Sequence, residues 1–299
     1  MKDSPTYTIA VSSCNMEDTV QRSLESMLEQ VTDEYEVVVI DDSTDNSPDI
    51  LQEMENNWDS LRVFTDCGND NLAEARNESF ERARGDYVLS SLDVDNVYDP
   101  VIQDFVTIYH QMEQAVDMPL FLSGQGINMA SRSLLLDVPY RSLGYGEDRD
   151  YWRQMMAAGA YVGMGHASIE EQIGYQRGAV GTFEVGFETI MVQFQSGMKL
   201  IPYIRWAIAE TVADRGRPRH RALLHVMLSV PAYVAAMMCE QTYEAPEPYD
   251  DMSVWKHALR SHTMTLSELE AAYGFSLDRS DLSDRGRELF DVDDANFPL

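Results

Sequence analysis

The chain has 299 residues, of which 44% are hydrophobic and 10% aromatic, so it can bury a sizeable core and belongs with globular rather than disordered proteins. A formal net charge of −29 argues against a broad basic face for nucleic acid. Its three cysteines, Cys14, Cys67 and Cys239, are too few and too scattered for a disulfide framework or a zinc site. We therefore expect a protein of the reducing cytoplasm, and the N-terminal residues show no pattern of a signal peptide.

Predicted strands and helices alternate through the first third of the chain. Apolar runs rich in β-branched residues predict strands over residues 8–14, 35–40, 61–64 and 87–92. Apolar residues at helical spacing predict helices over residues 20–31, 47–54 and 71–84. This alternation is typical of a layered α/β fold with a mostly parallel sheet and right-handed crossovers.

The pattern changes after Pro100. A helix is predicted over residues 101–112, followed by two short apolar runs at 120–123 and 127–131. A glycine-rich turn at residues 144–146 precedes a helix that begins near Glu147 and ends at Gly159. These elements extend the α/β fold.

Polar residues follow three of the predicted strands. Ser12 and Ser13 end the first, Asp41 and Asp42 end the second, and the triplet Asp93-Val94-Asp95 follows the fourth. The carboxyl ends of parallel strands lie at the same edge of a sheet, and α/β proteins bind ligands there. We therefore expect these polar groups to lie close together. Asp42 is suited to accept hydrogen bonds from a nucleobase or a ribose.

Two carboxylates separated by one residue, Asp93 and Asp95, form a hard-oxygen site. Mg²⁺ takes one or two carboxylates and fills its remaining positions with phosphate and water, so the triplet suits a cation that carries a diphosphate. Arg76, on the preceding helix, offers a fork of donors to the same phosphates. The alternatives are that the aspartates are ordinary surface acid in an acidic chain and that Arg76 is an exposed helix charge.

Glu147 and Asp148 open the helix that follows the glycine-rich turn. The positive end of a helix stabilises an ionised carboxylate, so Asp148 is suited to accept a proton from an attacking hydroxyl. The alternative is an acidic first turn without chemistry, which is favourable in any helix. Asp150 is either a ligand on the acceptor side or a surface residue.

Four segments in order resemble the family 2 glycosyltransferases of the GT-A fold: TIAVSSCN, VVVIDDSTD, NLAEARNESFERARGDYVLSSLDVDN and GYGEDRDYWRQMMAAG. The resemblance covers roughly residues 6–165 of the sequence. It implies a GT-A fold, a mostly parallel sheet flanked by helices, that binds a nucleotide-sugar donor.

The resemblance also implies roles for individual residues. Ser12 and Asp42 would contact the base and ribose, and Arg76 the nucleotide side of the donor. Asp93 would lie beside the diphosphate, and Asp95 would be the direct ligand of Mg²⁺ or Mn²⁺. Asp148 would be the general base of a single displacement with inversion.

Two positions depart from the family pattern. Cys14 stands where an aromatic residue usually precedes the asparagine of the first segment, so base stacking is expected from elsewhere. His166 corresponds, at a short spacing, to a histidine that some relatives place near the metal.

The sequence divides into a nucleotide-sugar-binding and catalytic domain, residues 1–180, and a helical region, residues 181–299. Six of the 22 basic residues fall within residues 199–221: Lys199, Arg205, Arg215, Arg217, Arg219 and Arg221. Residues 222–239 follow without any charge, which suits a segment at a membrane interface. The alternative is a buried helical hairpin. We expect the last 60 residues to form polar helices and a solvated tail.

Only three of the 22 basic residues are lysines, and acid is spread throughout the chain, a composition that resembles proteins of salt-accumulating halophilic archaea. With the family resemblance, this implies transfer from a UDP-sugar, a hexose or hexuronic acid, to a lipid-linked glycan of the dolichol phosphate type. The product would serve N-glycosylation, and the protein would lie at the inner face of the cell membrane.

Two alternatives remain. One is a synthase that transfers a single sugar to a polyprenyl phosphate, whose oxygen is already ionised and needs no base. The other is a non-catalytic binding module like a receiver domain, which VVVIDDS resembles. A receiver needs a lysine at the end of its last strand, and no lysine lies between Lys2 and Lys199.

Overall fold

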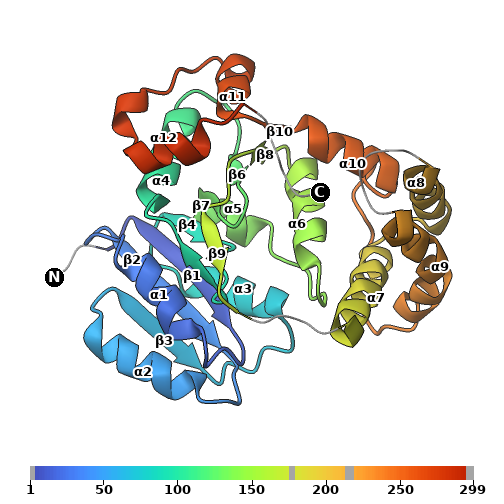
Figure 1. Cartoon of the computed structure of the whole chain (residues 1–299), viewed down its shortest axis with the longest axis horizontal. Coiled ribbons are helices and arrows are strands. Elements are labelled where there is room, and N and C mark those ends of the chain that lie inside the picture. The colour runs from blue at the N-terminus through green and yellow to red at the C-terminus, as the bar shows by residue number, and fades with distance from the viewer. Residues whose placement is uncertain (1–3, 175–178, 213–218, 294–299) are drawn as a thin grey trace.

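The computed structural model of the chain describes residues 4–174, 179–212 and 219–293. Within them, the central sheet has eight strands: β1 (Tyr7–Ser13), β2 (Tyr35–Asp41), β3 (Leu61–Thr65), β4 (Tyr87–Ser90), β6 (Phe121–Ser123), β7 (Asn128–Ser131), β8 (Tyr161–Met164) and β10 (Thr263–Met264). Their order is β10-β8-β6-β7-β4-β1-β2-β3 (Figure 1). Every pairing is parallel except those of β7 with β4 and β6. The predicted mostly parallel sheet is confirmed.

A separate antiparallel ribbon pairs β5 (Asn96–Tyr98) with β9 (Glu170–Gln172). Helices cover both faces of the central sheet. One face packs on α1 (Val20–Leu28), α2 (Ser47–Asn57), α4 (Ile102–Glu113), α11 (Leu266–Tyr273) and α12 (Asp284–Phe290). The other packs on α3 (Leu72–Arg82), α5 (Arg132–Asp137) and α6 (Glu147–Ala157).

Strand side chains alternate between these two cores. Ile9 and Val11 of β1 enter the first core, whereas Ala10 enters the second, as the two-residue period of a strand requires. Every residue of β2 is buried, with Val37 and Val39 packed on one face of the sheet and Val38 and Ile40 on the other, which explains its continuous β-branched run. Gly85 precedes β4 where a Cβ would lie 2.7 Å from the backbone nitrogen of Thr8, so only glycine allows this approach.

Helices α7 (Ala179–Gln195), α8 (Leu200–Val212), α9 (Arg219–Ala236) and α10 (Met252–Ser261) lie beyond α6, on the side away from α1 and α2 (Figure 1). Phe194, Tyr203, Ala232 and Trp255 extend the second core into this group. The uncharged run predicted at 222–239 forms most of α9, which contains Pro231. Among the described residues, no helix is both long and apolar enough to cross a membrane.

The end of the chain returns to the central sheet. β10 pairs with the edge strand β8, and α11 and α12 place Leu266, Leu269 and Phe290 in the first core. The expectation of polar helices and a solvated tail is therefore wrong for residues 263–290, because their apolar side chains complete one face of the sheet. The division of the chain at residue 180 stays a prediction, although these contacts join the two regions.

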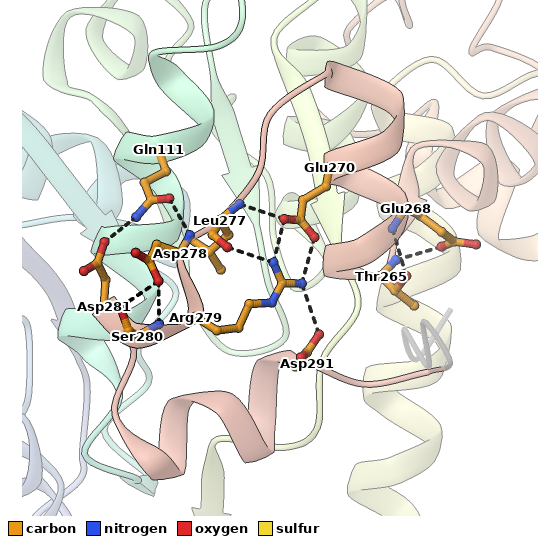
Figure 2. Close-up of polar contacts among 10 residues, drawn as sticks. All are labelled: Gln111, Thr265, Glu268, Glu270, Leu277, Asp278, Arg279, Ser280, Asp281 and Asp291. Atoms are coloured by element: carbon orange, nitrogen blue, oxygen red, sulfur yellow. Dashed lines mark hydrogen bonds and ion pairs between the residues drawn. The ribbon is translucent and has the colours of Figure 1, made fainter.

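Polar contacts fasten this returning segment (Figure 2). Arg279, in the short 3₁₀-helix η1 (Arg279–Asp281), donates both terminal nitrogens to Glu270, at 2.5 and 2.7 Å, and one of them to Asp291, at 3.3 Å. Gln111 of α4 donates to Asp281 at 3.0 Å and accepts from the backbone of Asp278 at 3.2 Å. Hydrogen bonds and ion pairs therefore hold residues 270–291 together and attach them to α4.

Two aspartates of the first region hold α12. Arg285 forms a bidentate ion pair with Asp99, with nitrogen–oxygen distances of 2.9 and 3.1 Å. Asp104, which is 4% exposed, accepts from the backbone and the hydroxyl of Ser283, both at 2.7 Å. Charge-assisted bonds of this kind are shorter and stronger than neutral ones, so they fix the position of α12.

Replacing Phe290 by alanine is expected to lower the free energy of unfolding by about 3–5 kcal/mol, because a fully buried ring leaves a cavity. Its neighbours Phe105 and His166 lie 6.0 and 5.2 Å away between ring centres. Denaturant unfolding measures the loss. Glu288→Ala, at an exposed position of the same helix, is the control and should change stability by about 0.5 kcal/mol or less. A loss below about 1 kcal/mol for Phe290→Ala would show that α12 is not part of the core.

Candidate active site

The carboxyl ends of β1 and β2 lie side by side. Ser13 pairs with Asp41 in the parallel ladder, and the backbone nitrogen of Asp42 donates to Ser13 at 3.2 Å. The Ser12 and Ser13 hydroxyls and one Asp41 oxygen are buried without a hydrogen-bond partner among the described residues. Because buried polar atoms are nearly always paired, these atoms mark a place for a polar ligand or ordered water.

Asp42 lies just beyond β2 and holds the loop between β3 and α3. One oxygen accepts from the backbone of Gly68 at 2.8 Å, and the other from the side chain of Asn69 at 2.9 Å. An ionised carboxylate has about four acceptor positions, so both oxygens retain capacity for a ligand. Cys14, which replaces the expected aromatic residue, is exposed beside Asp42.

Arg76 connects the two acidic motifs. Its side chain is 11% exposed and pairs with Glu147 at 2.7 Å and with Asp93 at 3.7 Å, while its guanidinium lies 5.4 Å from the centre of the Tyr140 ring. Burial by itself would lower the pKa of Arg76, but Tyr140, Glu147, Asp93 and Asp148 together raise it. The structure therefore brings the D-x-D loop and the start of α6 to one guanidinium.

Asp148 is the second residue of α6. Gly146 precedes the helix with a φ of +105°, a conformation that favours glycine and sets the entry angle of the helix. The loop is anchored from α7, where Glu188 accepts from the backbone of Tyr145 at 3.0 Å. Asp148 is half-buried, and one of its oxygens accepts from the backbone of Arg149 at 2.8 Å. Both the turn and α7 thus position it.

Glu147 is buried beside Asp148. Burial raises the pKa of Glu147, Arg76 opposes that rise, and Asp148 adds to it. One Glu147 oxygen bonds Arg76 and the other accepts from the backbone of Gly146 at 3.0 Å. Since both oxygens are engaged within the protein, Glu147 orients Arg76 and the helix start and leaves Asp148 as the more accessible carboxylate.

The D-x-D loop lies between β4 and β5. Asp93 is 59% exposed at its side chain, and Asp95 is half-buried. The backbone oxygen of Asp95 accepts from Ile173 and Gly174, at 2.8 and 3.0 Å, so the chain after β9 fixes the loop. Asn96 donates to one Asp95 side-chain oxygen at 3.1 Å.

The donor set at this loop fits a hard cation. Among the described residues, no group of three or more metal-binding side chains is preformed. A site with one or two carboxylates suits Mg²⁺ or Mn²⁺ that takes its other ligands from a diphosphate and water. Asp95, with Asp93 beside it, would hold such a cation.

Glu170, on β9, is a site residue that the sequence analysis missed. It is half-buried, and burial together with the charges of Asp93 and Asp95 raises its pKa to about 7. A single glutamate in so acidic a chain carries no distinguishing pattern. Its proximity to the D-x-D loop depends on the ribbon of β5 and β9, which pairs residues more than 70 positions apart.

His166 and Asp150 have structural roles. Both ring nitrogens of His166 are engaged: Nδ1 donates to Ala167 at 2.6 Å and Nε2 accepts from the backbone of Gln125 at 2.8 Å. Burial lowers the pKa of His166 to about 4, in keeping with this neutral form. Both ring nitrogens are therefore used within the protein, and neither is left for a cation.

Asp150 is fully buried and is neither a surface residue nor an acceptor ligand. It pairs with Arg153 at 3.4 Å and with Arg141 at 3.5 Å. Arg153 in turn donates to Gln193, in the last turn of α7, at 3.0 Å and to Ser196, which directly follows that helix, at 2.6 Å. A buried charge needs such partners, and here they tie α6 to α7.

Residues 8–170, more than half of the chain, match the family model described as glycosyl transferase family 2. The chain therefore belongs to glycosyl transferase family 2. Among curated proteins it is 36% identical over 85 residues to "Putative teichuronic acid biosynthesis glycosyltransferase TuaG" of Bacillus subtilis, a match covering 28% of this chain and 34% of that protein. The match thus spans about a third of this relative.

Two solved structures share the fold. S. aureus TarS 1–349 in complex with UDP-GlcNAc aligns with a TM-score of 0.51 and 15% identity, over 77% of this chain and 73% of that one. Mannosyltransferase PcManGT from Pyrobaculum calidifontis, in complex with GDP-Man and Mn²⁺, aligns with a TM-score of 0.51 and 16% identity, over 90% and 86%. These likenesses and the family match confirm the GT-A fold. The receiver-like alternative is wrong, since the chain belongs to another family and its sheet contains the antiparallel β7.

Glu170→Gln is expected to flatten the pH dependence of stability between the ordinary glutamate pKa of 4.5 and the folded value of about 7. In this window the folded wild type binds one more proton than the unfolded chain, so its stability falls as pH rises and the loss is complete above the folded pKa. Glutamine removes that fall, so the variant should gain stability relative to wild type at about pH 8 but not below about pH 4.5.

Thermal unfolding at both pH values, without divalent cations, measures this effect. Glu171→Gln, at the exposed neighbouring position of β9, is the matched control and should follow the wild type. An equal shift of Glu170→Gln at the two pH values would contradict the raised pKa.

Proposed function

We propose that this chain is an inverting glycosyltransferase that uses a nucleotide-sugar donor and Mg²⁺ or Mn²⁺. The observation that carries the proposal is the contact of Arg76 with both Asp93 and Glu147. Through it the D-x-D loop, where a diphosphate would bind, and the start of α6, where Asp148 would accept a proton, are held at one guanidinium. Membership of glycosyl transferase family 2 supports the same activity.

These positions support a single displacement as the proposed reaction. The acceptor oxygen forms a bond to the anomeric carbon from the side of Asp148, while the bond from that carbon to the diphosphate breaks on the opposite side, so the configuration inverts. Asp148 takes the hydroxyl proton, and the bonding electrons leave with the nucleoside diphosphate. A bound cation supplies positive charge to that leaving group. Ser12 and Asp42, at the ends of β1 and β2, would hold the base and ribose.

The donor is proposed to be a UDP-sugar carrying a hexose or a hexuronic acid, and the acceptor a lipid-linked glycan of the dolichol phosphate type. Scarce lysine and widely distributed acidic residues support the proposal that the protein works in the cytoplasm of a halophilic archaeon. There such a product would serve N-glycosylation. The protein would then work peripherally at the inner face of the membrane. The neighbouring structures hold UDP-GlcNAc in one case and GDP-Man in the other, so both nucleotides belong in the test.

Calorimetric titration of UDP is expected to show binding with Mn²⁺ and none with a chelator, because the diphosphate and the carboxylates share the cation. Asp95→Ala should lose this binding. Asp137→Ala, which removes an exposed aspartate of α5, is the matched control and should bind as the wild type does. Failure of UDP and GDP alike to bind in molar salt with Mn²⁺ would refute the proposed donor site.

Asp148→Asn is expected to lower kcat by about 10²–10⁴-fold while leaving the affinity for UDP and Mn²⁺ unchanged, because asparagine cannot accept the proton. Single-turnover transfer to a hydroxyl acceptor measures the rate, and the titration described for Asp95 measures affinity. Transfer to the hydroxyl acceptor at the wild-type rate would refute Asp148 as the base. Slow transfer to the hydroxyl together with wild-type transfer to a polyprenyl phosphate, whose acceptor oxygen needs no base, would instead favour the polyprenyl phosphate synthase.

A further inference from the structure

The neighbouring helices α8 and α9, with the two residues that follow α9, expose many apolar side chains. We define the apolar face as Ile201, Ile208, Val212, Leu223, Met227, Val230, Val234, Met237 and Met238. These are nine of the thirteen large apolar side chains that are exposed among the described residues, and Met238, Val212 and Met227 are 81, 76 and 67% exposed. Within α9, Leu223, Met227, Val230 and Val234 are spaced by three or four residues, which places them on one side of the helix.

Such a patch calls for a partner, because monomeric proteins seldom expose large contiguous apolar areas. The four remaining exposed apolar residues, Leu72, Leu136, Tyr145 and Val254, come from four different segments of the chain. The concentration on α8 and α9 is therefore a local property of these helices and not a general feature of the surface.

The charge balance of the sequence reverses in the segment that contains the apolar face. The whole chain has 51 acidic and 22 basic residues, whereas residues 199–239 have two acidic and six basic ones. Arg205 is exposed on α8 between Ile201 and Ile208. A second copy of the chain would bring a net charge of −29 to this surface. A lipid surface offers phosphates to a basic side chain such as that of Arg205 and hydrocarbon to the apolar side chains.

A cavity of about 560 Å³ opens beside the apolar face. Its wall includes Phe194, Met198 and Tyr233, and two residues of the apolar face, Ile201 and Met237, also line it. Lys199, 60% exposed and paired with Asp250, lies at the same cavity. An irregular apolar hollow suits a flexible hydrocarbon chain, with the ammonium group close to a polar head.

We propose that the apolar face of α8 and α9 docks on a lipid bilayer and that the adjoining cavity receives a hydrocarbon chain from it. The helices would lie in the plane of the interface, since none of those described can span a membrane. This inference deepens the proposed function and rests on it only for the identity of the acceptor.

Docking here would place the bilayer near the proposed base. Helix α7, which packs on α9, holds the loop before Asp148 through Glu188 and holds Arg153 of α6 through Gln193 and Ser196. Helix α7 thus connects the helices of the apolar face to α6. A sugar acceptor carried on a lipid would then approach the side of the site that Asp148 occupies.

Flotation of the full chain with phosphatidylcholine vesicles, with and without anionic lipid, tests the proposal without donor or metal. The wild type is expected to float with the vesicles and to remain bound in molar salt, because salt screens the arginine contacts but not apolar burial. The double variant Met227→Glu, Met238→Glu should float at least tenfold less. The matched control Leu136→Glu, Val254→Glu changes two exposed apolar residues elsewhere and should float like the wild type.

Unfolding temperature and UDP titration show whether each variant is folded. A folded double variant that floats like the wild type would overturn the proposal, as would a wild type that binds UDP and stays off every vesicle. Light scattering tests whether a second copy of the chain covers the apolar face instead. This would be so if the wild type is a dimer, the double variant is a monomer, and neither protein floats. Loss of UDP binding with normal flotation would refute the proposed donor site and leave the docking face intact.

Discussion

The arrangement of the site depends on the buried guanidinium of Arg76. Five carboxylates come together around it or near it: Asp93, Asp95, Glu147, Asp148 and Glu170. Without a cation among them, mutual repulsion and the cost of burying Glu147 would force the D-x-D loop and the start of α6 apart. Arg76 compensates part of that charge, and a divalent cation would compensate more of it.

The second half of the chain supports this arrangement from two sides. Helix α7 anchors the turn before Asp148 through Glu188, and the buried network of Asp150, Arg153 and Gln193 ties α6 to the same helix. On the opposite side of the sheet, α11 and α12 complete the first core. Both groups therefore pack on elements that carry the candidate site.

Local sequence patterns determined much of the fold and part of the site. The all-buried run of β2, the helix from Asn71 and the helix that starts at Glu147 lie where periodicity and turn residues predict them. The sequence also predicts which polar residues gather at the strand ends: Ser12, Asp42 and the D-x-D triplet. The reason is that the carboxyl ends of parallel strands lie at the same edge of a sheet. Each of these depends on residues close together in the chain.

Tertiary structure alone decided the contacts that join distant segments. Arg76 reaches Glu147 across 71 positions of the chain, Glu170 approaches the D-x-D loop through the ribbon of β5 and β9, and Phe290 returns to pack on Phe105. Side-chain type could not reveal these pairings in a chain with 51 acidic residues, since any of many carboxylates would suit an arginine. The partner is selected by how the layers pack, and that is a property of the whole fold.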